Sequence, residues 1–458
     1  MKKSFKAKNI SVKVISLAVA AAAALCCASC DGGGNHASGK RVEIRVMSGD
    51  RARMDELQKA TDEFNESNDK NIHVTLDFLG DNAGDVVKAG YTSESAPEIH
   101  SAMGGALDEL AIKSGWYREI DEQTINEWRE KYGDISIAKA DKRTGKIYAL
   151  LSPPSDTDCS GYKFLWNKDL FAEANLDPET PPKTWDEVRE FAKKITAVGN
   201  GKKYGYVMPF KDSIFTRYYV VLPGATSGAY NADGFDPTKG EYDFSVYAPI
   251  IKAYRDIISD GSVFPSPNTI DNDTARAQFA EGNIGMICAA GWDVDVFNSQ
   301  FVPKNDWGIA EYPVVDTFKG GYPYCVNNGI VDYFMCADSP HPEEQMYVYK
   351  WLLSLNKSDE DKKQRKGNDE FSQYKYPLAK SDDADTPDSM VKIEGENKWD
   401  GLKNLILNND DIESGLQKIS DTYNAAMKKA EESGEDIQQY HNPDYSFYAD
   451  SYEKLGAN

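Results

Sequence analysis

Five side chains that could contact a small ligand lie directly after predicted strands. They are Asp50, Arg51, Asp81, Trp292 and Asp293. Ligands of open α/β sheets bind outside the carboxyl ends of the strands, so these positions suit a binding site. An indole ring can stack on an apolar face of a ligand, and a carboxylate accepts short, strong hydrogen bonds from hydroxyl groups. This chemistry suits noncovalent recognition of a ligand that has both an apolar face and hydroxyl groups.

Each of these side chains also has a purely structural interpretation. Asp50 is a suitable helix N-cap, Asp81 is typical of a turn, and Trp292 is large enough to belong to a core. A further candidate, Asp158, lies in the loop before a predicted strand that contains Trp166. We expect Trp166 to pack in the core. For the other residues, the sequence leaves both interpretations open.

The sequence lacks the motifs of the common metalloproteases, hydrolases and nucleotide-binding enzymes. It contains no H-E-x-x-H, no G-x-S-x-G and no G-x-x-x-x-G-K-[ST], and only five histidines occur. Two acidic stretches, 231–243 and 271–273, could hold calcium but lack the spacing of an EF-hand. Among 74 acidic residues, two carboxylates at glycosidase spacing would arise by chance. We therefore expect a binding protein with no catalytic residue, no metal and no cofactor.

The elements that must position the candidate residues alternate between strands and helices. Apolar residues alternate at 42–46 and 72–78, the period of a strand, and recur every three or four residues at 54–64, the period of a helix. This order predicts two parallel strands joined by a right-handed crossover. Thr184 and Glu187 form a capping box, which predicts a helix start. The chain as a whole is predicted to have an α/β fold.

The N-terminus has the layout of a lipoprotein signal peptide. Its parts, in order, are a basic stretch (1–13), an apolar stretch (14–25) and an Ala-Ser-Cys sequence that ends at Cys30. The last part resembles a bacterial lipobox, with Cys27 where leucine is usual. We expect lipidation of Cys30, removal of residues 1–29 and a flexible tether at 30–40. The alternative is a plain secretory signal with a stray cysteine.

The charge of the chain excludes one class of partner. The net charge is -22, and the first 29 residues carry five lysines and no acid, so the mature chain is more acidic still. A surface of that sign repels phosphate backbones, so we expect no nucleic-acid partner.

Four cysteines remain after the signal junction: Cys159, Cys288, Cys325 and Cys336. Their spacing is not that of metal ligands, and most have apolar neighbours. We expect buried thiols, although one disulfide is compatible with an extracellular location.

Six segments, in the same order along the chain, resemble the family 1 extracellular solute-binding proteins, the group that includes maltose-binding protein. The segments are 64–74, 96–99 (Ala-Pro-Glu-Ile), 145–150 (Gly-Lys-Ile-Tyr-Ala-Leu), 164–171 (Phe-Leu-Trp-Asn-Lys-Asp-Leu-Phe), 181–187 (Pro-Pro-Lys-Thr-Trp-Asp-Glu) and 279–292. Two positions depart from the pattern, because Glu98 replaces an aspartate and Trp166 a tyrosine.

The resemblance implies a two-lobed periplasmic-binding-protein-like fold of type II, with the ligand cleft at the hinge between the lobes. The first lobe would comprise 41–154 and 326–355, and the second 155–325 and 356–458.

The resemblance also implies roles for particular residues. Trp292 lies where the family places a stacking aromatic, and Trp399 where it often has a second one. Tyr324 and Asn327 lie where the chain crosses between the lobes, and Asp50 with Arg51 looks like the polar pair of the first loop.

The implied protein is a monomeric, lipid-anchored receptor on the extracellular face of a membrane, in a host that we expect to be Gram-positive. It would bind an oligosaccharide, close around it and deliver it to the permease subunits of an ABC importer, whose ATPase is a separate chain. Contact with the membrane would be through the lipid anchor only. The alternatives are a receptor for another solute, such as a polyamine, amino acid or metal chelate, a secreted polysaccharide-active enzyme, or a structural surface lipoprotein.

Overall fold

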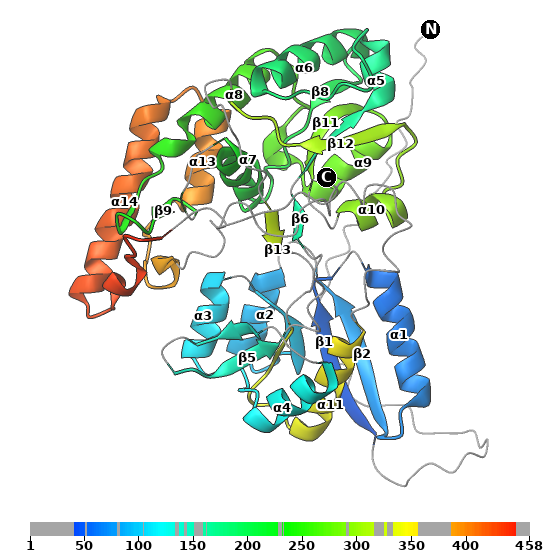
Figure 1. Ribbon diagram of the computed structural model, residues 1–458, viewed down its shortest axis with the longest axis vertical. Helices are drawn as coiled ribbons and strands as arrows, with labels where there is room; N and C mark the ends of the chain where they lie inside the picture. Colours follow the sequence, from blue (N-terminus) through cyan, green and yellow to red (C-terminus); the bar gives the residue numbers. More distant parts are fainter. Residues whose placement is uncertain are drawn as a thin grey trace, which may run out of the picture. The chain divides into compact units, whose positions relative to one another are not determined.

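The computed structural model (Figure 1) describes most of the chain after the signal segment. The described residues are 41–50, 53–79, 83–103, 105–132, 137–141, 144–150, 159–161, 163–227, 231, 233–289, 293–315, 325–327, 333–355 and 386–445. The predicted signal peptide, the tether and Cys30 lie outside them. Within the described ranges, no helix is long and apolar enough to cross a membrane.

The first of two four-stranded sheets has the strand order β14-β3-β1-β2. Its strands are β1 (Val42–Ser48), β2 (Ile72–Phe78), β3 (Ile99–Ser101) and β14 (Tyr333–Met335). β1 runs parallel to β2, and α1 (Met54–Ser67) connects them, burying Leu57, Thr61 and Phe64 against the sheet. The predicted strand–helix–strand unit with parallel strands is therefore confirmed.

The first sheet and its helices form the first lobe (Figure 1). Its other elements are α2 (Ala83–Thr92), α3 (Gly105–Lys113), α4 (Glu122–Tyr132), β4 (Ile137–Ala140), β5 (Ile147–Leu150) and α11 (Pro342–Ser354). α11 comes late in the chain yet packs against β1 and β14. The hydroxyl of Tyr349 on α11 accepts a hydrogen bond from the Leu150 N–H at 3.0 Å, which ties the returning segment to β5.

The second sheet has the strand order β12-β7-β11-β8. Its strands are β7 (Lys163–Asn167), β8 (Tyr204–Tyr206), β11 (Ile284–Ala289) and β12 (Trp307–Glu311). β11 is parallel to β8 and antiparallel to β7. Trp166 on β7 is buried, as predicted, and its Nε1 donates to the Pro178 carbonyl at 2.9 Å.

Helices on the second sheet and the C-terminal segment complete the second lobe. They are α5 (Lys168–Glu173), α6 (Trp185–Gly199), the π-helix η2 (Arg217–Val221), α7 (Leu222–Thr226), the 3-10 helix η3 (Ser245–Tyr247), α8 (Ala248–Ser259), the 3-10 helix η4 (Pro267–Thr269), α9 (Asn272–Ala280), α10 (Asp293–Ser299), the 3-10 helix η6 (Pro387–Ser389), α13 (Lys398–Leu407), α14 (Ile412–Glu432) and the 3-10 helix η7 (Ile437–Tyr440). The mixed α/β class predicted from the sequence is confirmed, with sheets in two lobes. A short ribbon pairs β6 (Cys159–Gly161) with β13 (Cys325–Asn327).

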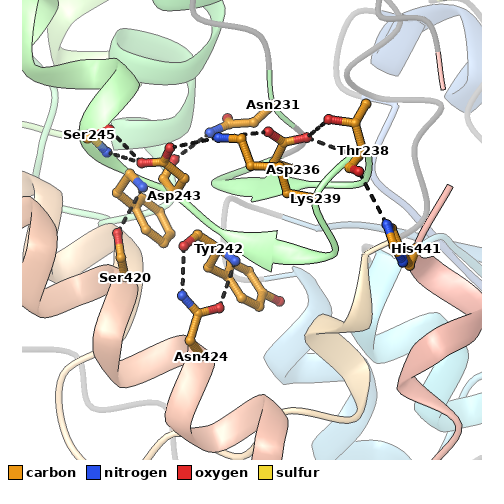
Figure 2. A network of polar contacts seen from close by, with 11 residues as sticks. Asn231, Asp236, Thr238, Lys239, Tyr242, Asp243, Ser245, Ser420, Asn424 and His441 are labelled. Carbon is orange, nitrogen blue, oxygen red and sulfur yellow. Dashed lines mark hydrogen bonds and ion pairs between the residues drawn. The ribbon is translucent and has the colours of Figure 1, made fainter. Parts of the chain in front are cut away.

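The C-terminal segment is fastened to the second lobe through a hairpin, β9 (Phe235–Asp236) and β10 (Glu241–Tyr242) (Figure 2). The Asn424 amide on α14 accepts from the Tyr242 N–H and donates to its carbonyl, both at 2.8 Å. His441 Nε2 lies 3.2 Å from the Thr238 carbonyl in the hairpin turn. Segments distant in sequence therefore share one core, which also includes α8 and α13.

The predicted capping box is present at the start of α6. Thr184 Oγ1 accepts from the Glu187 N–H at 3.2 Å, and Glu187 Oε2 accepts from the Thr184 N–H at 3.3 Å. We expect Thr184→Ala to lower the free energy of unfolding by about 1 kcal/mol, because a backbone N–H at the helix start loses its acceptor. Chemical denaturation measures the change. Thr184→Ser keeps the hydroxyl and should retain nearly all of the stability; an equal loss in both variants would contradict the cap's role.

Candidate ligand-binding site

Asp50 lies just after β1, where its carboxylate is held by Arg53. Arg53 Nε donates to Asp50 Oδ2 at 2.7 Å, and the Arg53 N–H donates to Oδ1 at 3.3 Å. Burial opposes the charge on Arg53, but the Asp50 carboxylate outweighs it and raises the pKa of Arg53. Asp50 is not the helix N-cap that the sequence allowed, because α1 has Arg53 as its N-cap and no side-chain cap hydrogen bond. Contact of Asp50 with a ligand stays a prediction.

Asp293 is the first residue of α10 and follows the carboxyl end of β11. Its Oδ1 accepts from Arg276 Nε at 2.8 Å and from Arg276 Nη2 at 2.6 Å. Arg276 Nη1 also donates to Asp273 Oδ1 at 3.1 Å. Burial alone would lower the pKa of Arg276, but the carboxylates of Asp293 and Asp273 outweigh burial and raise it. The predicted ligand-binding aspartate is therefore part of an arginine-centred network.

Trp399 is half-buried on α13, packed against the core of the second lobe. The ammonium of the neighbouring Lys398 lies 5.0 Å from the indole centroid, 5.6 Å from the Tyr242 centroid and 5.7 Å from the Tyr423 centroid. The same ammonium lies 2.5 Å from Asp388 Oδ2. Trp399 is thus one of three aromatic rings that make cation–π contacts with a buried lysine, a role that the sequence did not reveal.

The other predicted site residues are not placed. Trp292, Arg51, Asp81, Tyr324 and Asp158 lie outside the described residues. Asn327 is placed through its backbone alone, opposite Cys159 in the β6–β13 ribbon. The described candidates Asp50, Asp293 and Trp399 are each held by neighbours within their own lobe, and the roles of all these residues in binding stay predictions.

Sequence reasoning missed the cations that hold these candidates. Arg53 is three residues from Asp50, a spacing that could have suggested the pair. Arg276 is 17 residues from Asp293 and on a different helix, so no local spacing pointed to it. Lys398 directly precedes Trp399, but its burial depends on Asp388 and on the rings of β10 and α14.

The acidic stretch 231–243 contains its own cation (Figure 2). Lys239 Nζ lies 3.3 Å from both Asp236 Oδ2 and Asp243 Oδ2, between the two carboxylates. The Asn231 amide is used within the loop, where its Nδ2 donates to the Asp243 carbonyl at 2.7 Å. Across the described ranges, no group of three or more His, Cys, Asp or Glu side chains is arranged to hold a metal ion.

The side chains of two cysteines are described, and neither resembles a nucleophile. Cys288 and Cys336 are free and buried, which confirms the prediction for these two. Burial raises the pKa of Cys288 to about 12, despite hydrogen bonds from Tyr206 and its neighbours, and burial also raises the pKa of Cys336. Both sulfurs are therefore thiols at neutral pH, and the thiolate is the nucleophilic form.

The chain is similar to known binding proteins in sequence. Residues 48–355 match the family model described as bacterial extracellular solute-binding protein. A putative binding protein of Brucella abortus (strain 2308) is 27% identical over 264 residues, which are 55% of this chain and 59% of that protein. The chain thus spans a little over half the length of that curated relative.

Solved structures show the same fold. A solute-binding protein from Thermotoga lettingae TMO, bound to α-D-tagatose, has a TM-score of 0.59 and 19% identity, covering 85% of this chain and 100% of its own. A sugar transporter protein from Bacillus licheniformis, in complex with stachyose, has a TM-score of 0.57 and 15% identity. The match covers 84% of this chain and 100% of that protein. These are binding proteins rather than enzymes. The predicted two-lobed fold is confirmed, and with the match over 48–355 the chain belongs to the bacterial extracellular solute-binding protein family.

Proposed function

We propose that this protein is the carbohydrate-binding subunit of an ABC importer, which closes around a neutral saccharide and delivers it to the permease. The observation that carries the proposal is the pairing of charges at the sheet edges. Asp50 after β1 is neutralised by Arg53, and Asp293 after β11 by Arg276. Carboxylates held in this way still accept hydrogen bonds from hydroxyl groups.

The same pairing argues against charged ligands. A polyamine site needs carboxylates in excess of cations, and an amino-acid site needs a cation for the ligand's carboxylate. At both described sheet edges, the acid and the arginine instead satisfy each other at 2.7 Å and 2.6 Å. An uncharged ligand leaves these pairs intact and is therefore favoured.

Closure would bring the two lobes together on the ligand. We keep the proposed lobes as 41–154 with 326–355, and 155–325 with 356–458. The packing of β14 and α11 with the first sheet, and of α13 and α14 with the second core, supports these boundaries. We further propose that Cys30 carries a lipid that holds the receptor at the extracellular membrane surface. Family membership supports that location and the permease as partner.

Intrinsic fluorescence of the eight tryptophans, titrated with a panel of ligands, tests the proposal. The panel contains raffinose, stachyose, α-D-tagatose, D-mannitol, spermidine and glutamate. We expect a saturable change with at least one saccharide, and recovery of that saccharide uncut. Binding of spermidine or glutamate alone, or appearance of shorter glycans, would overturn the proposal.

Trp292 is predicted to stack on the saccharide, so its ring should carry much of the affinity. We expect Trp292→Ala to weaken binding by roughly 1–3 kcal/mol, the scale of one buried aromatic contact. Calorimetric titration with the tightest-binding saccharide measures this as an increase in Kd of about 5- to 150-fold. Trp292→Phe keeps a flat ring and should lose less. An unchanged Kd in Trp292→Ala would remove this residue from the site.

A further inference from the structure

Arg276 makes several hydrogen bonds, both to Asp293 at the start of α10 and to the first residues of its own helix, α9. Two of its N–H groups donate to one oxygen of Asp293, and a third donates to Asp273. The Asn272 amide, with its oxygen turned to the guanidinium, accepts from Nη1 at 3.2 Å and Nη2 at 3.0 Å. Because the guanidinium is planar and forked, these contacts fix both the position and the plane of the Asp293 carboxylate.

The pair is buried, and removing both charges from water costs free energy that offsets much of their attraction. Arg276 is 7% exposed and Asp293 is 6% exposed. Buried ion pairs are often no more stabilising than well-packed apolar residues of similar volume, because both charges lose their hydration. Stability alone therefore does not explain the choice of these residues. Their location does offer an explanation, because Asp293 begins α10 at the carboxyl end of β11, where ligands of α/β sheets bind.

A buried hydroxyl in the same lobe has no hydrogen-bond partner in the part of the chain that the structure describes. Tyr219 is 2% exposed, and among the described residues its hydroxyl has no hydrogen-bond partner. Burial is the main cause that raises the pKa of Tyr219; Cys288 and Asp293 raise it further, whereas Arg276 lowers it. Tyr219 belongs to the π-helix η2, a geometry that is frequent at functional sites. Buried hydroxyl groups normally bind protein, water or ligand atoms.

We propose that Arg276 is a positioning residue for ligand binding: it fixes Asp293, and with it the start of α10, in the orientation that receives the saccharide. This inference rests on the proposed function and adds to it a residue that does not itself touch the ligand. The inference predicts that the affinity for the saccharide stays low even in a variant whose thermal stability is restored.

The experiment compares three variants by calorimetric titration and by thermal unfolding. The titrant is the member of the raffinose, stachyose, α-D-tagatose and D-mannitol panel that binds the unmodified protein most tightly. Arg276→Met removes the cation that neutralises the buried Asp293 carboxylate. We therefore expect a lower thermal midpoint, and a Kd raised between roughly tenfold and a hundredfold. The double variant Arg276→Met/Asp293→Leu removes both charges, so we expect its midpoint to return toward that of the unmodified protein while its Kd stays raised.

Arg189→Met is the control, because it breaks another arginine–aspartate pair elsewhere in the same lobe. Arg189 donates to both oxygens of Asp260, at 2.5 Å and 3.1 Å, between α6 and the end of α8. We expect this variant to change Kd by less than about twofold, since its pair is not at a strand end.

Two results would overturn the inference while leaving the proposed function intact. One is a Kd in Arg276→Met within about twofold of the unmodified value, and the other is recovery of Kd together with the midpoint in the double variant. If the unmodified protein binds no saccharide of the panel, the proposed function fails, and this inference fails with it.

Discussion

Replacing Trp185 by alanine is expected to lower the free energy of unfolding by roughly 3–5 kcal/mol, the range for large aromatic side chains deleted from a core. Trp185 is the first residue of α6 and is 1% exposed. Its ring packs edge-on against Tyr254, with centroids 5.0 Å apart, and against Phe164 at 5.9 Å and Tyr206 at 6.2 Å. The variant loses these contacts and leaves a cavity in the core of the second lobe.

The matched variant Trp185→Phe separates packing from polar interactions. The indole Nε1 is buried and has no hydrogen-bond partner among the described residues. Removing that N–H therefore relieves an unsatisfied donor while most of the ring volume is kept, so we expect a loss of about 1 kcal/mol. Urea denaturation followed by circular dichroism measures both values. A loss as large in Trp185→Phe as in Trp185→Ala would show that a phenyl ring does not replace the packing of the indole, and would contradict this prediction.

The elements that could be predicted from the sequence are those whose signals lie within a few neighbouring residues. The Thr184–Glu187 capping box gave the start of α6, and alternation gave β2. Gly282, at a φ of 80°, ends the helix before β11, because glycine adopts this left-handed conformation without strain. That helix begins at Asn272, because Asp271 Oδ1 caps it by accepting from the Thr274 N–H at 2.8 Å.

The candidate site could be predicted only by residue type and by place after a strand. Strand ends gave Asp50 and Asp293, but not the arginines that orient them, since a side chain's partner is chosen by tertiary packing. Trp399 illustrates the limit. Its surroundings come from Asp388, and from Tyr242, whose hydroxyl donates to Asp388 from 146 residues away in sequence. No periodicity or local spacing carries information over that distance.

A buried histidine gives the first lobe an expected sensitivity to mild acid. His100 lies on β3 and is fully buried, with a relative exposure of 0%. Its Nδ1 lies 2.7 Å from the Ser101 carbonyl, which can only accept, so Nδ1 carries the hydrogen. Nε2 therefore accepts from the Tyr91 hydroxyl at 2.8 Å. Both ring nitrogens are satisfied in the neutral form. A second proton, on Nε2, would face the Tyr91 hydroxyl group that donates to this nitrogen.

Burial lowers the pKa of His100 from 6.5 to about 4, although the Ser101 carbonyl opposes the shift. The unfolded chain therefore binds a proton between these values that the folded chain does not bind. Stability from this group is complete above pH 6.5 and is lost as the pH falls toward 4. A shift of this size corresponds to roughly 3 kcal/mol. We expect urea midpoints to fall accordingly between neutral and mildly acidic pH.

The Asp271 carboxylate does not account for a loss across this window. The Asp271 carboxylate, held by the Thr274 hydroxyl and N–H, has its pKa lowered from 3.8 to about 2, so its contribution is lost only at more acidic pH. His100→Asn removes the titrating ring and should flatten the dependence above pH 4, even if the variant is less stable at neutral pH. His441→Asn replaces an exposed histidine elsewhere in the chain and is the control for the loss of an imidazole ring. The same slope in His100→Asn as in the unmodified protein would assign the acid sensitivity to another group.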